Sequence, residues 1–128
     1  MKKYLLDSNI VIYYLHGEPK VLSAIENMTK ANACFYISMI TWIEVLAGSF
    51  KHEKSIDDMA SEMDAFAVLP IDKVTGMEAG RLLQTSILSG RKENFPDAVI
   101  AATAIVNDIP LLTNNPRDFK PFRGLKLV

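Results

Sequence analysis

Residues 4–15 of the chain are YLLDSNIVIYYL, an apolar stretch interrupted by a single acid. Residues 4–6 are predicted to form the end of a short buried strand. The polar pair 8–9 before the apolar run 10–15 is typical of a cap that opens a helix. Asp7 is therefore expected at the carboxyl end of a strand, directly before a helix.

The same alternation of strand and helix patterns continues along the chain. We predict helices over residues 21–30, 39–50, 55–66, 74–88 and 98–107, and strands over 33–37, 68–71, 110–113 and 125–127. In helix 39–50 the predicted apolar stripe consists of Ile40, Ile43, Leu46 and Ala47. Alternating strands and helices predict an α/β fold with a mainly parallel central sheet covered by helices on both faces.

Composition is that of one globular domain spanning residues 1–128, with 49% hydrophobic and 23% charged residues. Cys34 is the only cysteine, which excludes an internal disulfide and favours a reducing cytoplasm. No uncharged stretch approaches the roughly 18 residues of a membrane helix, and the first apolar run ends at Asp7, too early for a signal peptide. We expect a soluble, cytoplasmic protein without a membrane partner.

Charge argues against a protein held to nucleic acid by electrostatics alone, because the net charge is −1. Any contact with nucleic acid must therefore be local. Candidate contacts are Arg91 and Lys92, shortly before Asp97, and Arg117 in the basic C-terminal piece. Solvated surface explains these residues equally well.

Acidic and polar residues are expected to gather at the carboxyl edge of the sheet, where ligands bind in open parallel sheets. Asp7 follows the first strand, Asp97 opens the helix before the strand 110–113, and the polar run 113–118 follows that strand. Glu44 joins them if its helix leans over the same edge. Each acid has apolar neighbours, and carboxylates are costly to bury unless they are paired with cations.

The sequence offers no protein cation for these acids. No lysine or arginine lies within two residues of Asp7, Glu44 or Asp97, and His16 and His52 are far apart without ligand spacing, so both are interpreted as surface residues. A divalent cation with oxygen ligands, Mg²⁺ or Mn²⁺, is the simplest remedy for converging carboxylates. Such an ion suits phosphodiester hydrolysis.

Structural explanations compete with this interpretation. Taken singly, Asp7 and Asp97 are better explained as helix N-caps, each stabilising by about 1 kcal/mol. Glu44, in mid-helix beside an apolar stripe, is more often a surface residue. The hypothesis of a metal site depends on all of these acids meeting in one place.

Four blocks of the sequence resemble, in order and spacing, the signature blocks of VapC-type PIN domains. They are LLDSNIVI at 5–12, residues 37–48 around Glu44, DAVIAATA at 97–104 and LTNNPRDF at 112–119. The resemblance spans nearly the whole chain. It implies a three-layer α/β/α PIN-like fold and a Mg²⁺- or Mn²⁺-dependent endoribonuclease toxin with one or two ions per site. It also implies an RNA substrate, with transfer RNA a frequent target, a homodimer and a cognate VapB-like antitoxin.

By match of motif, Asp7, Glu44 and Asp97 take the firm catalytic and metal-ligand positions. The fourth acidic position falls at Asp118, preferred for its charge, or at Asn115 as a neutral ligand. A second ion would lie nearer Asp97 and Asp118. The resemblance gives supporting roles to four further residues. The hydroxyls of Ser8 and Thr113 would orient the carboxylates or a bound water. The amides of Asn9 and Asn114 would lie outside the carboxylates.

Two other classes of protein share part of this pattern with a ribonuclease. A haloacid-dehalogenase-like phosphatase also places Asp after its first strand, but it requires a second Asp two residues on, where this chain has Asn9. A non-catalytic PIN-like module that binds RNA or a partner is compatible with the same motifs, because the fourth acidic position is doubtful.

Overall fold

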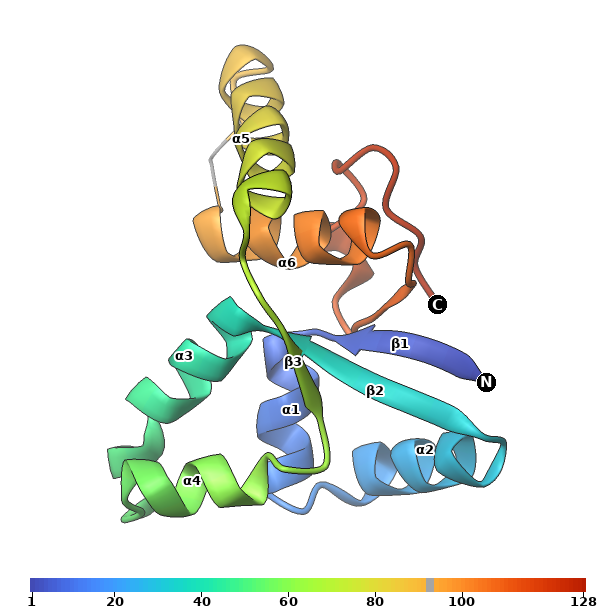
Figure 1. Ribbon diagram of the computed structural model, residues 1–128, viewed down its shortest axis with the longest axis vertical. Helices are drawn as coiled ribbons and strands as arrows, with labels where there is room; N and C mark the ends of the chain where they lie inside the picture. The colour runs from blue at the N-terminus through green and yellow to red at the C-terminus, as the bar shows by residue number, and fades with distance from the viewer. Residues whose placement is uncertain (92–93) are drawn as a thin grey trace.

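The centre of the molecule is a parallel β-sheet. The computed structural model describes residues 1–91 and 94–128. Within them, four strands lie in the order β3-β2-β1-β4, and every neighbouring pair is parallel (Figure 1). The strands are β1 (Lys2–Leu6), β2 (Ala33–Ser38), β3 (Ala67–Leu69) and β4 (Leu111–Leu112). The predicted α/β fold with a parallel central sheet is confirmed.

Helices cover both faces of this sheet (Figure 1). One face carries α1 (Ser8–Leu15), α2 (Pro19–Lys30), α3 (Met39–Ala47) and α4 (Ile56–Glu62), with the 3₁₀ turn η1 (Ser49–His52) between the last two. The other face carries α5 (Lys73–Leu88) and α6 (Phe95–Val106). A second 3₁₀ turn, η2 (Pro116–Asp118), follows β4. The result is the expected three-layer α/β/α arrangement.

Two hydrophobic clusters hold the layers together, one on each face. Successive residues of a strand point to opposite faces, so Leu5 packs with Ile100 and Leu111 beneath α6, whereas Leu6 packs with Val11 and Ile37 beneath α1. All six side chains are buried. Burial on both faces explains why successive residues at the end of β1, Leu5 and Leu6, are both apolar.

The helix predicted over 39–50 is shorter and turns a different face to the core. It ends at Ala47, and after Gly48 the chain continues as η1. The predicted stripe was wrong at Ile43, which is 55% exposed, and at Ala47, which is also exposed, while Thr41 and Val45 are buried. Thr41 faces inward because its hydroxyl finds a partner in Ser8 at 2.8 Å.

Other boundaries also differ from the prediction: α4 ends at Glu62 rather than at residue 66, and β3 ends at Leu69 rather than at residue 71. The strand expected at 125–127 is reduced to a single parallel bridge between Leu111 and Leu127. Helix α6 begins at Phe95, three residues before the predicted start, because Asn94 caps it. Among the described helices, none has both the length and the apolar character needed to cross a membrane.

Candidate active site

Asp7 lies where the carboxyl ends of β1 and β4 meet. Leu6 pairs with Leu112 across these strands, and the Asp7 backbone N–H donates to the Leu112 carbonyl at 3.0 Å. The Thr113 hydroxyl, one residue beyond β4, donates to Asp7 Oδ2 at 2.9 Å. Asp7 is only 4% exposed. Adjacent parallel strands thus deliver an acid and the hydroxyl that orients it to one point.

The Asp7 carboxylate does not act as a helix cap. Asp7 occupies the N-cap position of α1, but its side chain makes no capping hydrogen bond. Burial raises the pKa of Asp7, hydrogen bonds from Thr113 and the Ser8 backbone N–H oppose this, and the charge of Asp118 raises it further. The competing interpretation of Asp7 as an ordinary cap therefore fails.

Replacement of Thr113 by Val should remove the hydroxyl that holds Asp7. We expect cleavage activity to fall about 10- to 100-fold, as on loss of an outer partner of a metal ligand. The Thr113 hydrogen bond lowers the Asp7 pKa, so its loss should move the acidic limb of the pH–rate profile to higher pH. Thr113→Ser, which keeps the hydroxyl, should restore both values; an unchanged limb in the Val variant would contradict this role.

Asp97 lies in the first turn of α6 rather than at its cap, which is Asn94. Asn94 Oδ1 accepts the Asp97 backbone N–H at 3.1 Å. The pKa of Asp97 is raised to about 6, mainly by burial and then by the charges of Asp7, Asp118 and Glu44, in that order. Asp97 therefore experiences the negative charge of all three other candidate acids.

Glu44 approaches from α3 through a short chain of hydroxyls. Its side chain is exposed, and Oε1 accepts a hydrogen bond from the Ser8 hydroxyl at 3.0 Å. Ser8 in turn contacts the hydroxyl of buried Thr41. Thr41 was missed in the sequence, although Ser38, Thr41 and Glu44 share one face of a helix by their i, i+3 spacing.

The two candidates for the fourth acidic position, Asn115 and Asp118, lie side by side. Asn115 Nδ2 donates to Asp118 Oδ2 at 2.6 Å, and the Asn115 backbone N–H donates to the Thr113 hydroxyl at 3.0 Å. Both side chains are exposed, as are Asn9 and Asn114. Of these two residues only Asp118 carries a charge, and that charge raises the pKa values of Asp7 and Asp97.

The predicted basic contacts lie at the surface where the structure describes them, and one prediction about the histidines was wrong. Arg91 and Arg117 are exposed, and Lys92 lies outside the described residues. His16 and His52 are on the surface as expected, but they are not far apart: their Nε2 atoms are separated by 3.1 Å. Packing of α1 against α3 brings them together, which residue spacing could not reveal.

The chemistry of the acids fits a hard divalent cation. In the described part of the chain, no ion pair involves any of the four acids, and no three potential ligands are already gathered tightly enough to enclose an ion. Burial and mutual repulsion raise the pKa of Asp97, and a bound cation would relieve both effects. Mg²⁺ and Mn²⁺ prefer such oxygen donors.

Known proteins resemble the chain over nearly its full length. Ribonuclease VapC1 of Haemophilus influenzae strain R2866 is 27% identical over 126 residues, covering 96% of this chain and 94% of that protein. The tRNA(fMet)-specific endonuclease VapC of Shigella flexneri is 26% identical over 129 residues, covering 98% and 96%. The crystal structure of VapBC2 from Rickettsia felis, bound to a DNA fragment from its promoter, contains a chain with a TM-score of 0.85 and 25% identity, covering 98% and 97%.

A family model covers the part of the chain that contains the candidate acids. The PIN domain model matches residues 4–124, a range that includes all four candidate acids. Its match removes the haloacid-dehalogenase alternative, which the asparagine at position 9 already disfavoured. The chain, with a parallel sheet that ends in a cluster of acids, belongs to the PIN domain family.

Proposed function

We propose that this protein is a divalent-metal-dependent endoribonuclease toxin that hydrolyses RNA phosphodiester bonds and is neutralised by a VapB-like antitoxin. The observation that carries the proposal is the raised pKa of Asp97, to which Asp7, Asp118 and Glu44 all contribute through their charges. Four acids that interact in this way, without a protein cation among the described residues, form a site suited to a metal ion. The names of the relatives, ribonuclease and endonuclease, support RNA hydrolysis.

Mg²⁺ or Mn²⁺ would be held by Asp7, Glu44 and Asp97, and a second ion would lie nearer Asp97 and Asp118. An ion of this kind polarises a phosphoryl oxygen and lowers the pKa of bound water, so no histidine base is needed. The protein contributes position: Thr113 fixes one oxygen of Asp7 and Ser8 fixes one oxygen of Glu44. The cap at Asn94 fixes the first turn of α6, from which Asp97 projects.

The comparisons and the exposed arginines support the partners proposed for this protein. Solved structures similar to this chain are toxin–antitoxin complexes, which supports a VapB-like antitoxin, and we propose a homodimer that acts in the cytoplasm on RNA. Transfer RNA is the first substrate to test, because one relative is named for it. Arg91 and Arg117 are the exposed candidates for phosphate contacts.

Asp118, rather than Asn115, is proposed as the fourth ligand, and two substitutions separate these residues. Asp118→Asn should lower the cleavage rate at least about tenfold, because it removes a charge that the other acids experience. Asn115→Ala should cost less, since it removes only the hydrogen bond to Asp118. Rates measured over a range of Mg²⁺ concentrations would show the difference, and a larger loss for Asn115→Ala would assign the position to Asn115.

The proposed activity is tested with purified protein freed of antitoxin and incubated with a pool of structured RNAs. Cleavage is expected in Mg²⁺ or Mn²⁺, with 5′-phosphate ends on the products, and should disappear in EDTA and return when metal is restored. An absence of cleavage in both metals, from folded protein that still binds RNA, would favour the non-catalytic binding module. Cleavage that persists in EDTA would contradict the role of the metal.

A further inference from the structure

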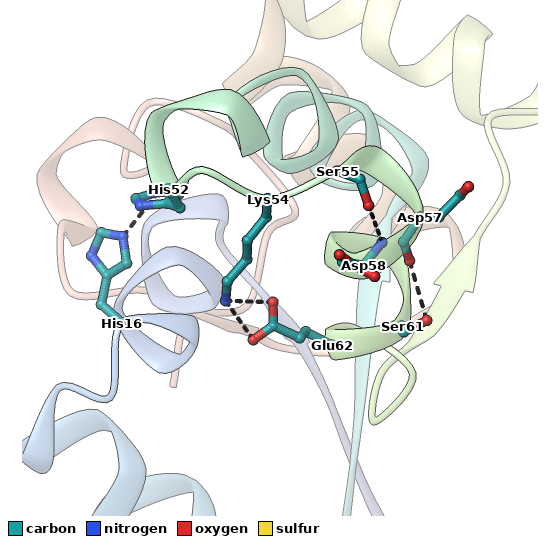
Figure 2. A network of polar contacts seen from close by, with 8 residues as sticks. All are labelled: His16, His52, Lys54, Ser55, Asp57, Asp58, Ser61 and Glu62. Atoms are coloured by element: carbon teal, nitrogen blue, oxygen red, sulfur yellow. Dashed lines mark hydrogen bonds and ion pairs between the residues drawn. The ribbon is translucent and has the colours of Figure 1, made fainter.

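His16 and His52 form a side-chain pair that the proposed nuclease site does not use. His16 is the C-cap residue of α1, and His52 is the last residue of η1. Their rings meet edge to face, with centroids 4.4 Å apart and an interplanar angle of 72°, and their Nε2 atoms are 3.1 Å apart (Figure 2). Both side chains are exposed. The two Nε2 atoms therefore face each other at the surface.

This separation suits two nitrogen ligands of one metal ion. Zn–N bonds of about 2.0–2.1 Å at a tetrahedral angle place the two nitrogens roughly 3.3–3.4 Å apart. The observed 3.1 Å is close to that value. Without a metal, one nitrogen must carry the proton that the other accepts. A metal ion can replace that proton once each ring carries its own proton on Nδ1.

We propose that His16 and His52 bind a borderline-soft divalent ion, such as Zn²⁺, through their Nε2 atoms, beside the proposed carboxylate site and not through its oxygen ligands. Imidazole nitrogen suits Zn²⁺, whereas carboxylate oxygen suits Mg²⁺ and Mn²⁺, so donor chemistry distinguishes the two sites. Among the described residues no third potential protein ligand completes the group. Water fills the other positions, and the ion is exchangeable.

The surroundings of the pair accept a cation and leave room for its waters. Both histidines line a cavity of about 290 Å³, which Glu44 and Lys51 also line. Lys54, which follows closely after His52, is engaged by Glu62 at 2.7 Å (Figure 2). The carboxylate of Glu44 offsets part of the positive charge that Lys51 and a bound ion bring to the cavity.

A bound ion would link the end of α1 to the turn that follows α3. The same two helices carry the contact between Ser8 and Glu44. Ions that bind the folded state alone stabilise it in proportion to their occupancy. Zn²⁺ should therefore raise the melting temperature of the protein through this pair.

Zn²⁺ binding is best measured on tag-free protein in a Cys34→Ser background with excess Mg²⁺. This background removes the only thiol, and His16 and His52 are the only histidines of the chain, while Mg²⁺ occupies oxygen ligands. In NMR spectra, the two imidazole Hε1 resonances should shift together and saturate at one added ion per chain. Saturation without a shift in both rings would overturn the proposal.

Matched variants test the same site by affinity, measured by competition with a chromophoric Zn²⁺ chelator. His16→Gln and His52→Gln should each weaken Zn²⁺ binding at least tenfold and abolish the rise in melting temperature. Lys51→Ala, which changes the same cavity but keeps both imidazoles, should retain both. Mg²⁺-dependent RNA cleavage should persist in the histidine variants. Unchanged Zn²⁺ affinity in either histidine variant would overturn the proposal, whatever the outcome for the nuclease.

Discussion

Asp97→Asn is expected to abolish RNA cleavage and to stabilise the metal-free protein at the same time. Loss of a ligand charge should cost at least about a hundredfold in rate, the upper end of what loss of an outer partner costs. The pKa of Asp97 is raised from 3.8 to about 6, so the folded protein disfavours the charged form. Asn has the same shape without the charge, and should add on the order of 1–2 kcal/mol of stability at pH 7.

The sign of the pH dependence follows from the raised pKa. A carboxyl group whose pKa is higher in the folded state contributes most to stability below its unfolded value of 3.8, and this contribution is lost as the pH rises through about 6. In EDTA, the stability advantage of Asp97→Asn over wild type should therefore grow between pH 4 and pH 7. Urea unfolding at several pH values measures it.

Asp108→Asn is the matched control for Asp97. Asp108 is exposed just after the same helix, and its φ of 51° is a conformation that Asn adopts readily. Its ion pair with Lys126 is on the surface and worth little. This variant should cleave RNA like wild type. Equal cleavage by the Asp97 variant would refute its role, and a destabilised Asp97 variant would refute the electrostatic argument.

Glu44→Gln is expected to lower cleavage as strongly as Asp97→Asn, by at least about a hundredfold, but with little change in stability. Glu44 is exposed, and a Gln side chain can still accept the hydrogen bond from Ser8. The substitution thus removes a ligand charge while keeping its support. Single-turnover rates over a range of Mn²⁺ concentrations should show weaker metal binding. Urea unfolding of the same variant should show an unchanged midpoint.

Glu26→Gln provides the control for this change. Glu26 is an exposed glutamate on α2 whose partner is Lys30, one turn away. Its replacement should leave both rate and metal dependence unaltered. If Glu44→Gln also behaved as wild type, Glu44 would be a surface residue at the border of the apolar stripe of α3, the alternative that its sequence context allowed.

The fold could be predicted where local pattern and burial agree. The end of β1 is apolar at successive residues because both faces of the sheet are covered there, and this pattern is visible in the sequence. The face of α3 was predicted incorrectly because Thr41 is buried through a hydrogen bond to Ser8, so a polar residue took the place that hydropathy gave to Ile43. The C-terminal strand was overpredicted because apolar residues there form only one bridge.

The residues of the candidate site could be named from the sequence, but the contacts between them could not. Asp7 was expected at the end of β1, and the parallel sheet explains why Thr113 lies beside it. The support of Asp97 by Asn94 depends on where α6 starts, which sequence patterns locate only to within a few residues. The approach of His16 to His52 depends on tertiary packing between segments 36 residues apart.

The central claim, that the four acids act together as one metal-binding cluster, is tested most directly by the pH dependence of RNA cleavage at two Mg²⁺ concentrations. Metal ligands must be deprotonated, so Mg²⁺ competes with the proton on Asp97. At low Mg²⁺ the acidic limb should have its midpoint near the Asp97 pKa of about 6. A tenfold increase in Mg²⁺ should lower the midpoint by up to about one pH unit. A midpoint that stays at the same pH at both concentrations would contradict the claim.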